Sequence, residues 1–303
     1  MSYAPVVIFG YKRPKHLYHL LNSLEKCENS NKTDVFIFVD GARREEDKPI
    51  ILETYKIANM DRKFRTKKVI ISDYNKGLAN SVIDGVTEIM NRFGKVIVLE
   101  DDLIVNKNFL RVMNNLLDFY EQDGKIWSIS GYSFPIDTSS IIVDWYAVKR
   151  ASSWGWASWH NRWNKIEWDM NALLTKNAQK LKSLYREIPD SKMMIYNYKK
   201  GLIDSWALRW TLNQYFLDKI SLSPKYSLLR NNGFDPSGTH GSMRKDYNKN
   251  YLPNFEPQSE KYVNSETINE LFRDFCKPTI YNRISFILKK LNLYKPIKEL
   301  LRK

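Results

Sequence analysis

The amino-acid sequence predicts an α/β protein built on a mostly parallel sheet flanked by helices. Two observations carry this expectation. Over residues 1–130, short runs of apolar and β-branched residues alternate with longer stretches of helical periodicity, and this alternation is typical of βαβ units. No internal repeat and no Pro- or Ser-rich linker interrupts the 303 residues, so we expect one continuous core.

The first part of the chain contains four expected strands and three expected helices. The strand candidates are bounded by Gly, Asp or Lys and span residues 4–9, 35–39, 69–71 and 96–99. Apolar residues recur every three or four positions over residues 17–24, 50–57 and 78–89, a spacing that places them on one helix face. Each such helix would return the chain so that successive strands run parallel.

The middle of the chain is expected to extend the same core. Six of the nine tryptophans lie within residues 145–168, and a helical pattern over 204–218 and a strand near 221–229 follow. The segment RNNGFDPSGTHG, residues 230–241, is rich in Gly, Pro and Asn and is therefore expected to be a loop. Residues 242–275 are polar and show no clear period.

Half of the basic excess lies in a short C-terminal tail. The chain carries 48 Lys and Arg against 34 Asp and Glu, a net charge of +14, and residues 276–303 supply +7 of it. Residues 279–294 place apolar side chains at helical spacing with Lys and Arg between them, as interfacial helices on anionic membranes do. We expect either a peripheral contact with an anionic membrane through residues 279–303 or a helix packed on the domain with a solvated basic face.

Composition argues against several other classes of protein. Cys27 and Cys276 make neither a disulfide framework nor a zinc cluster. No apolar run approaches a membrane span, and the N-terminal residues lack signal-peptide features. We therefore expect a cytoplasmic protein, or a peripheral one on the inner face of the cell membrane. Nucleic acid is not expected as a partner, because the basic excess lies in the tail whereas the tryptophans centre on residues 145–168.

The motif with the clearest chemistry is Glu100-Asp101-Asp102, directly after the fourth expected strand. Adjacent carboxylates repel one another, and ligands of open α/β sheets bind at the carboxyl ends of the strands. A divalent cation would relieve the repulsion, and oxygen ligands of this kind suit Mn²⁺ or Mg²⁺. Such an ion stabilises a departing nucleoside diphosphate. The alternative is an acidic loop that caps the helix beginning near Asn106.

Two further strand ends carry polar residues that fit a nucleotide site. Asp40 follows the second expected strand and Arg13 follows the first; a guanidinium suits a diphosphate, and a carboxylate accepts from a base or ribose. Each is unremarkable alone, since Asp-Gly is ordinary turn chemistry. Lys76, before Gly77, opens the third expected helix, where backbone N–H groups could receive the donor. A single Gly is a weak signal for this, and a simple loop-to-helix transition is the better explanation.

The chain resembles the inverting GT-A glycosyltransferases, and most closely the N-acetylglucosaminyltransferase I group with its bacterial relatives. The matching segments, in family order, are PVVIFGYKR (5–13), VFIFVDG (35–41), VLEDDL (98–103), IWSISGY (126–132), YAVKRASSWGW (146–156), DSWALR (204–209) and SGTHG (237–241). The resemblance implies a single continuous GT-A (Rossmann-like) domain with a C-terminal helical tail.

That resemblance also implies a division of labour along the chain. Residues 1–132 would be the nucleotide-sugar-binding half and residues 133–275 the acceptor-binding and catalytic-base half, and residues 276–303 would be the basic amphipathic tail. Thr239 and His240 would lie in the loop that closes over the diphosphate.

Residue by residue, the resemblance implies that Asp40 contacts the uridine and Arg13 the diphosphate. Glu100 would face the transferred sugar, Asp101 would lie at the ribose and the metal, and Asp102 would be the principal Mn²⁺ or Mg²⁺ ligand. The implied donor is UDP-GlcNAc.

Asp204 aligns with the catalytic aspartate of the family and would be the general base. The chain departs from its relatives at the two neighbours, Ile203 and Ser205, which bears on the sugar preference. An attacking hydroxyl needs a carboxylate at hydrogen-bond distance, from a segment distant from the acidic triplet. Alternatively Asp204 caps the following helix, and Asp169 is the second candidate base.

The tryptophans admit two interpretations. Aromatic faces stack on sugar rings, and Trp156 beside the flexible Gly155 is the candidate for acceptor binding. The others are expected to fill the core.

These observations predict an inverting, metal-dependent glycosyltransferase that moves a sugar from a UDP-sugar to a hydroxyl of a glycan or lipid-linked saccharide acceptor, in surface polysaccharide synthesis. The alternatives are a nucleotidyltransferase with the same metal chemistry and a non-enzymatic, basic nucleic-acid-binding protein.

Overall fold

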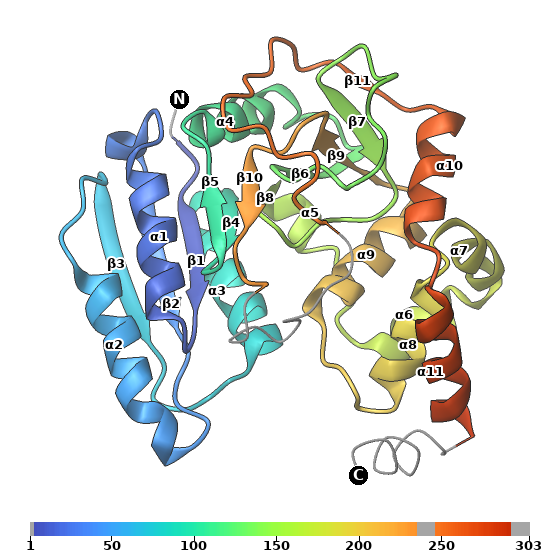
Figure 1. Ribbon diagram of the computed structural model, residues 1–303, viewed down its shortest axis with the longest axis horizontal. Coiled ribbons are helices and arrows are strands. Elements are labelled where there is room, and N and C mark those ends of the chain that lie inside the picture. Colours follow the sequence, from blue (N-terminus) through green and yellow to red (C-terminus); the bar gives the residue numbers. More distant parts are fainter. Residues whose placement is uncertain (1–2, 235–245, 292–303) are drawn as a thin grey trace.

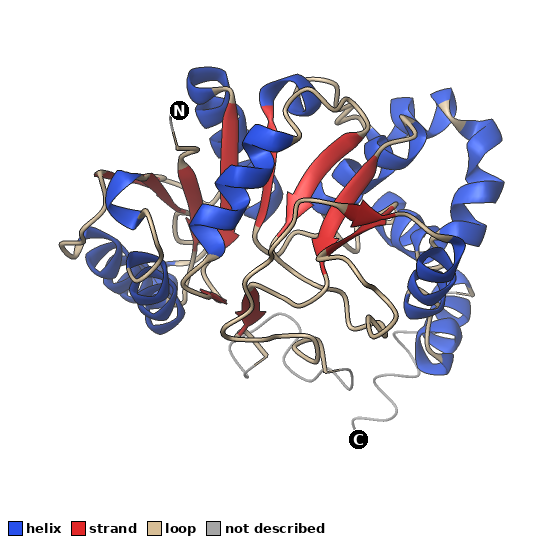
Figure 2. Cartoon of the chain, turned by 90° about the horizontal axis from the view of Figure 1, so that it is seen from above, coloured by secondary structure: helices blue, strands red, loops and turns tan. Residues whose placement is uncertain are grey.

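The computed structural model describes residues 3–234 and 246–291. Its central feature is a nine-stranded sheet with the order β11-β7-β9-β6-β8-β4-β1-β2-β3. Five of the eight strand pairings are parallel and three are antiparallel. Helices flank this sheet (Figures 1 and 2), so the predicted α/β class with a mostly parallel sheet is confirmed.

The first half of the chain forms the expected alternation of strands and helices. Its elements are β1 (Val6–Gly10), α1 (Pro14–Glu25), β2 (Asp34–Val39), α2 (Lys48–Asn59), β3 (Thr66–Ile71), α3 (Leu78–Phe93) and β4 (Lys95–Glu100), with short 3₁₀ turns at Ser30–Lys32 and Glu45–Asp47. Strand β3 begins three residues earlier than the apolar run predicted, because it is the edge strand of the sheet. Charged residues such as Lys67 and Lys68 are tolerated at an edge.

The second half adds antiparallel strands to the same sheet and a group of helices beside it (Figure 1). Its first elements are β5 (Leu103–Val105), α4 (Phe109–Phe119), β6 (Ile126–Ser130), β7 (Trp145–Val148), β8 (Trp156–Trp159), α5 (His160–Trp163), α6 (Met170–Lys176), a 3₁₀ turn at Ala178–Lys180 and α7 (Leu181–Glu187). The later ones are α8 (Ser191–Lys199), α9 (Trp206–Phe216), β9 (Ile220–Pro224), β10 (Leu229–Asn231), β11 (Tyr262–Val263), α10 (Glu266–Phe275) and α11 (Ile280–Lys290).

One strand was expected near residues 221–229, and the structure has two. Strand β9 joins the main sheet between β6 and β7, whereas β10 pairs antiparallel with β5 in a separate two-stranded sheet. The chain leaves the main sheet after Pro224, which has no N–H for a ladder. Consequently β10 carries the segment after it toward the end of β4.

The two faces of the sheet bury different side chains. Val6 and Ile8 of β1 point into one apolar cluster, and Val7 and Phe9 point into the other, as the alternation of a strand requires. The second cluster packs α3 and α9 against the sheet and contains five buried tryptophans, Trp127, Trp156, Trp163, Trp206 and Trp210. Of the six tryptophans in residues 145–168, Trp145, Trp156, Trp159 and Trp163 are buried, so the expectation that most of this group fills the core is confirmed.

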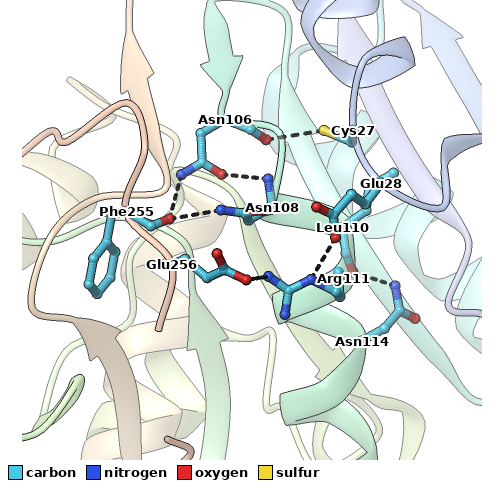
Figure 3. A network of polar contacts seen from close by, with 9 residues as sticks. All are labelled: Cys27, Glu28, Asn106, Asn108, Leu110, Arg111, Asn114, Phe255 and Glu256. Carbon is cyan, nitrogen blue, oxygen red and sulfur yellow. Dashed lines mark hydrogen bonds and ion pairs between the residues drawn. The ribbon is translucent and has the colours of Figure 1, made fainter. Parts of the chain in front are cut away.

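A polar network ties the segment after residue 246 to the first half of the chain (Figure 3). The Phe255 carbonyl accepts from the side-chain amides of Asn106 and Asn108, each at 3.2 Å. The Arg111 guanidinium donates to Glu28 at 2.7 Å and Glu256 at 2.6 Å. These contacts hold the returning chain across the N-terminal end of α4.

Both cysteines are free and buried. Burial raises the pKa of the Cys27 thiol to about 12, and its Sγ donates to the Asn106 carbonyl at 3.2 Å. Over the described ranges, no helix combines the length and the apolar character needed to cross a bilayer.

Candidate functional site

The ends of three neighbouring parallel strands meet at one edge of the sheet. Strand β1 lies between β2 and β4, with Gly10 opposite Val39 and Phe9 opposite Glu100. Arg13 follows β1, Asp40 follows β2, and the acidic triplet begins at the last residue of β4. The structure thus places these side chains at the same edge of the sheet, as expected from parallel strands.

An ion pair joins two of these strand ends. The Arg13 Nη1 atom donates to Asp102 Oδ2 at 2.9 Å, and both side chains are mostly buried. Arg13 directly precedes Pro14, the first residue of α1, so the proline and the helix fix the backbone that carries the guanidinium. The pair leaves the Asp102 carboxylate with a cationic partner on one oxygen.

The segment after β10 covers this ion pair. Asn232 donates its backbone N–H to the Asp102 carbonyl at 2.8 Å, and the Gly233 N–H is held by the Asn231 side chain at 2.7 Å. A Cβ atom on Gly233 would lie 2.2 Å from Asp102 Oδ2 and 2.9 Å from Arg13 Nη1. A larger residue at this position would therefore have to displace the side chains of the ion pair. Residues 231–233 were not predicted as part of the site, although the Asn-Asn-Gly run marked a turn.

The other two acids of the triplet are held in a low-dielectric, negatively charged environment. Burial, then the neighbouring Asp102 charge, raises the pKa of Asp101 to about 7, although its Oδ2 accepts the Tyr11 N–H at 3.1 Å. Burial and the charges of Asp102 and Asp101 raise the pKa of Glu100 to about 8. The Arg13 cation opposes both shifts without cancelling them. The local charge therefore favours either protonation or an additional cation.

Asp40 organises a loop through main-chain hydrogen bonds. Its Oδ1 accepts the N–H groups of Gly41 at 3.0 Å and Lys76 at 2.9 Å. Its Oδ2 accepts the Gly77 N–H and the Asn75 side-chain amide, both at 2.9 Å. A Cβ on Gly41 would lie 2.4 Å from the carbonyl carbon of Tyr74, so the two loops touch. Four donors occupy this carboxylate, and three of them come from residues 75–77. The main role of Asp40 in the structure is therefore to hold this loop.

The Lys76 side chain points to a neighbouring helix residue. Its Nζ lies 3.0 Å from Asp84 Oδ2, and this hydrogen bond raises the pKa of Lys76. Its backbone N–H, in contrast, belongs to the group held by Asp40. A contact between residue 76 and a nucleotide sugar would therefore involve the backbone of this loop rather than the Lys76 ammonium group.

The carboxylate oxygens of the triplet fit a Mn²⁺ or Mg²⁺ ion whose remaining coordination positions are filled by substrate phosphates and water. Among the described residues, no three His, Cys, Asp or Glu side chains converge as a preformed cage. Mg²⁺ is commonly held by one or two carboxylates together with substrate phosphates and water, and Mn²⁺ prefers the same oxygen donors. The Asp102 carboxylate, shared with Arg13, supplies one such anchor.

Asp204 lies on the loop directly before α9 and is exposed. Its side chain is 64% accessible and pairs with Arg209 Nη2 at 3.0 Å. The cap of α9 is Ser205, whose Oγ accepts the Leu208 N–H at 3.2 Å, so the alternative in which Asp204 caps the helix is wrong. The second candidate base, Asp169, is the N-cap of α6, and its carboxylate accepts backbone N–H groups of the first turn of that helix.

The interpretation of Trp156 as an acceptor-binding residue is corrected by the structure. Trp156 is fully buried, with its ring centroid 5.7 Å from that of Trp163 and 5.2 Å from that of Trp210. It begins β8 and points into the core, whereas Trp154, two residues earlier, lies in a loop and lines a cavity of about 940 Å³. The sequence run Ser-Trp-Gly-Trp does not reveal which indole faces inward.

Thr239 and His240 lie in residues 235–245, outside the described residues. Their expected contacts with a diphosphate stay predictions.

Comparisons with known proteins give only distant likenesses. No protein-family model and no curated protein matches the chain. Residues 1–349 of Staphylococcus aureus TarS give a TM-score of 0.41 at 15% identity, over 73% of this chain and 57% of that one.

Two other solved structures are similar at the same level. The mannosyltransferase PcManGT from Pyrobaculum calidifontis, in complex with GDP-Man and Mn²⁺, gives 0.38 at 12% identity, covering 58% of this chain and 47% of that one. The glycosyltransferase GlyE of Streptococcus pneumoniae TIGR4 gives 0.36 at 15% identity, covering 74% and 45%. The chain spans 45% to 57% of the lengths of these three solved structures.

The raised pKa of Glu100 predicts an unusual dependence of stability on pH. An acid with a folded pKa of about 8 and an unfolded pKa near 4 destabilises the fold as pH rises between those values. In EDTA, Glu100→Gln should therefore melt above the wild type by at least about 2 °C at pH 9, with the difference shrinking toward pH 5. Differential scanning fluorimetry across this range measures it.

Glu88→Gln on the exposed face of α3 is the matched control and should follow the wild-type profile. Parallel wild-type and Glu100→Gln profiles from pH 5 to 9 would contradict the electrostatic account.

Proposed function

We propose that the chain is an inverting, metal-dependent glycosyltransferase of the GT-A type that transfers a sugar from a UDP-sugar to a hydroxyl of a glycan or lipid-linked saccharide, in surface polysaccharide synthesis. The observation that carries the proposal is the meeting of Arg13 and the acidic triplet at the ends of β1 and β4. A cationic fork beside crowded carboxylates is suited to a diphosphate and its metal ion.

The donor would bind along the carboxyl edge of the sheet. Arg13 would contact the diphosphate, Asp102 with Asp101 would hold Mn²⁺ or Mg²⁺, and Glu100 would face the transferred sugar. The bound metal ion would neutralise charge that develops on the leaving UDP. UDP-GlcNAc is the donor we favour, from the resemblance of the sequence motifs.

Asp40 would act on the uridine mainly through the loop that it holds. Both of its oxygens already accept N–H groups from residues 41 and 75–77. A preorganised loop needs no rearrangement when a base and ribose arrive, which lowers the entropy cost of binding. Thr239 and His240 would add donor contacts, as the resemblance of the sequence motifs implies.

Asp204 would be the general base on the acceptor side. It is exposed, so a hydroxyl group can approach it, and it comes from the half of the chain opposite the metal ligands. In a single displacement, the base and the leaving group must lie on opposite sides of the sugar. The Arg209 side chain, 10% accessible, holds the carboxylate from the α9 side.

The C-terminal helix supports a peripheral attachment to an anionic membrane on the cytoplasmic face. No residue of α11 is buried, and its exposed apolar side chains include Ile284 and Ile287. One face is tethered to α8, where the Tyr196 and Phe286 ring centroids lie 5.1 Å apart. The exposed apolar face, together with basic residues such as Lys290, fits a lipid interface better than a fully packed helix.

A screen of nucleotide sugars tests the reaction. We expect Mn²⁺-dependent release of UDP from at least one UDP-sugar, and a loss of about 100-fold in Asp102→Asn, measured by nucleotide chromatography. Asp118→Asn, which alters a carboxylate on α4 paired with Lys95, is the matched control and should retain activity. No response to UDP-, GDP- or TDP-sugars would reject the proposal. Pyrophosphate release from a nucleoside triphosphate would favour a nucleotidyltransferase.

The role of Asp204 is tested separately. Asp204→Asn should lower transfer to a panel of saccharide acceptors by at least about 100-fold, while calorimetry shows UDP-sugar binding within about two-fold of the wild type. Asp169→Asn is the matched control, because asparagine caps a helix as well as aspartate does. Near-normal turnover of Asp204→Asn would remove it from the base role.

Membrane attachment is tested with vesicles of phosphatidylglycerol and phosphatidylcholine. Replacing Ile284 and Ile287 together with asparagine should weaken co-sedimentation by at least about ten-fold, because the apolar anchor is lost. Leu52→Asn, at an equally exposed apolar position on α2, should bind like the wild type. Unchanged binding of the double variant would show that α11 is not the contact.

A further inference from the structure

A large cavity lies beside the helices of the second half. Its volume of about 940 Å³ is at the upper end of what small-molecule sites in proteins usually have. Its walls are largely apolar and come from the loop before β8, from α8 and α9, and from the start of α11. Its aromatic lining is Tyr132, Phe134, Trp154, Tyr247, Phe275 and Tyr281.

Two polar oxygens in this wall have no hydrogen-bond partner within the described part of the chain. Arg150 Nη1 donates to Asp190 Oδ2 at 2.7 Å, but Asp190 Oδ1 and Ser191 Oγ accept and donate nothing. Ser191 is only 2% exposed. Buried polar groups are nearly always paired in native proteins, so these two indicate a partner that arrives with a ligand.

The two oxygens lie just beneath the cavity wall. Both residues line the cavity, and Ser191 is the first residue of α8. Arg150 holds the Asp190 carboxylate in place by the other oxygen. The pair is therefore suited to a ligand hydroxyl, which both donates to a carboxylate and accepts from a serine.

The cavity is connected to the proposed donor site by a chain of contacts. The Trp154 ring lies 5.8 Å from that of Phe234, and Phe234 directly follows Gly233, whose backbone abuts the Arg13–Asp102 pair. On the other side, Ala207 in the first turn of α9 lines the cavity, three residues after Asp204. Lining residues of the cavity therefore contact the segment that covers the metal anchor and lie within one helical turn of the proposed base.

The start of α11 forms part of the cavity wall and is open to solvent. Ile280 and Tyr281 line the cavity and are 77% and 67% exposed. They continue into the exposed apolar face of α11 that includes Ile284 and Ile287. An apolar chain leaving the cavity would lie along this face.

We propose that this cavity binds the acceptor as a saccharide carrying an apolar aglycone, with a sugar ring against Trp154 and a hydroxyl between Asp190 and Ser191. The aglycone would leave over Ile280. This inference rests on the proposed glycosyltransferase function, and it specifies the acceptor class as an amphiphilic glycoside.

Binding of simple glycosides in the absence of nucleotide tests the inference. The probes are octyl and methyl β-glycosides of glucose and N-acetylglucosamine, used below their critical micelle concentrations and followed by tryptophan fluorescence and calorimetry. The wild type should bind the octyl glycoside of at least one sugar about ten-fold more tightly than its methyl glycoside. Ser191→Ala should weaken both by about five-fold or more, without lowering the melting temperature, because the hydroxyl has no partner in the protein.

Two further variants make the result specific. Ile280→Asn, at an exposed position, should reduce the advantage of the octyl over the methyl glycoside and leave methyl glycoside binding unchanged. Ser183→Ala on α7, whose hydroxyl donates to the Lys180 carbonyl outside the cavity, should change neither affinity.

The inference is overturned if none of the four glycosides binds, if octyl and methyl glycosides bind equally, or if Ser191→Ala binds like the wild type. These readouts need no donor, whereas UDP release in the nucleotide-sugar screen needs no glycoside. Failure of the cavity assignment and failure of the proposed reaction are therefore distinguishable.

Discussion

The ion pair between Arg13 and Asp102 is the interaction on which the arrangement of the site depends. It connects the end of β1 to the end of β4, and the Gly233 backbone closes over it. One guanidinium lies near three adjacent carboxyl groups. At an effective dielectric constant of 20, two unit charges 4 Å apart interact by about 4 kcal/mol, so the repulsion among the carboxylates is not negligible. Burial first, and then the excess negative charge, raise the pKa of Glu100 and that of Asp101. The same charge is the reason that we propose a divalent cation at this corner of the site.

Main-chain hydrogen bonds supply the rigidity around that charge. Asp40 gathers the N–H groups of the loop after β3, and Asp101 receives the Tyr11 N–H from the loop after β1. Each carboxylate thereby fixes a neighbouring loop against the end of a strand. A site held in this way is organised before a ligand binds, and binding then costs less ordering of side chains and loops.

The buried tryptophans connect this edge to the second half of the molecule. Trp156 on β8 packs against Trp206 and Trp210 of α9, and this contact fixes the helix that follows Asp204. The same helix contributes to the wall of the cavity in which Asp190 and Ser191 lack partners. The aromatic core thus sets the position of the proposed base and of the proposed acceptor cavity relative to the donor edge.

The sequence by itself determined the α/β class, the four strands and three helices of the first half, and the residues at the strand ends. These follow from local periodicity and from the rule that parallel strands end at a common edge. Tertiary structure alone decided that Trp156 is buried while Trp154 lines a cavity, that Ser205 rather than Asp204 caps α9, and that Gly233 covers Asp102. It also brought Asp190, Ser191 and Ile280 into the wall of one cavity. Such outcomes depend on which side chains meet across elements far apart in the chain, and local patterns hold no information about those meetings.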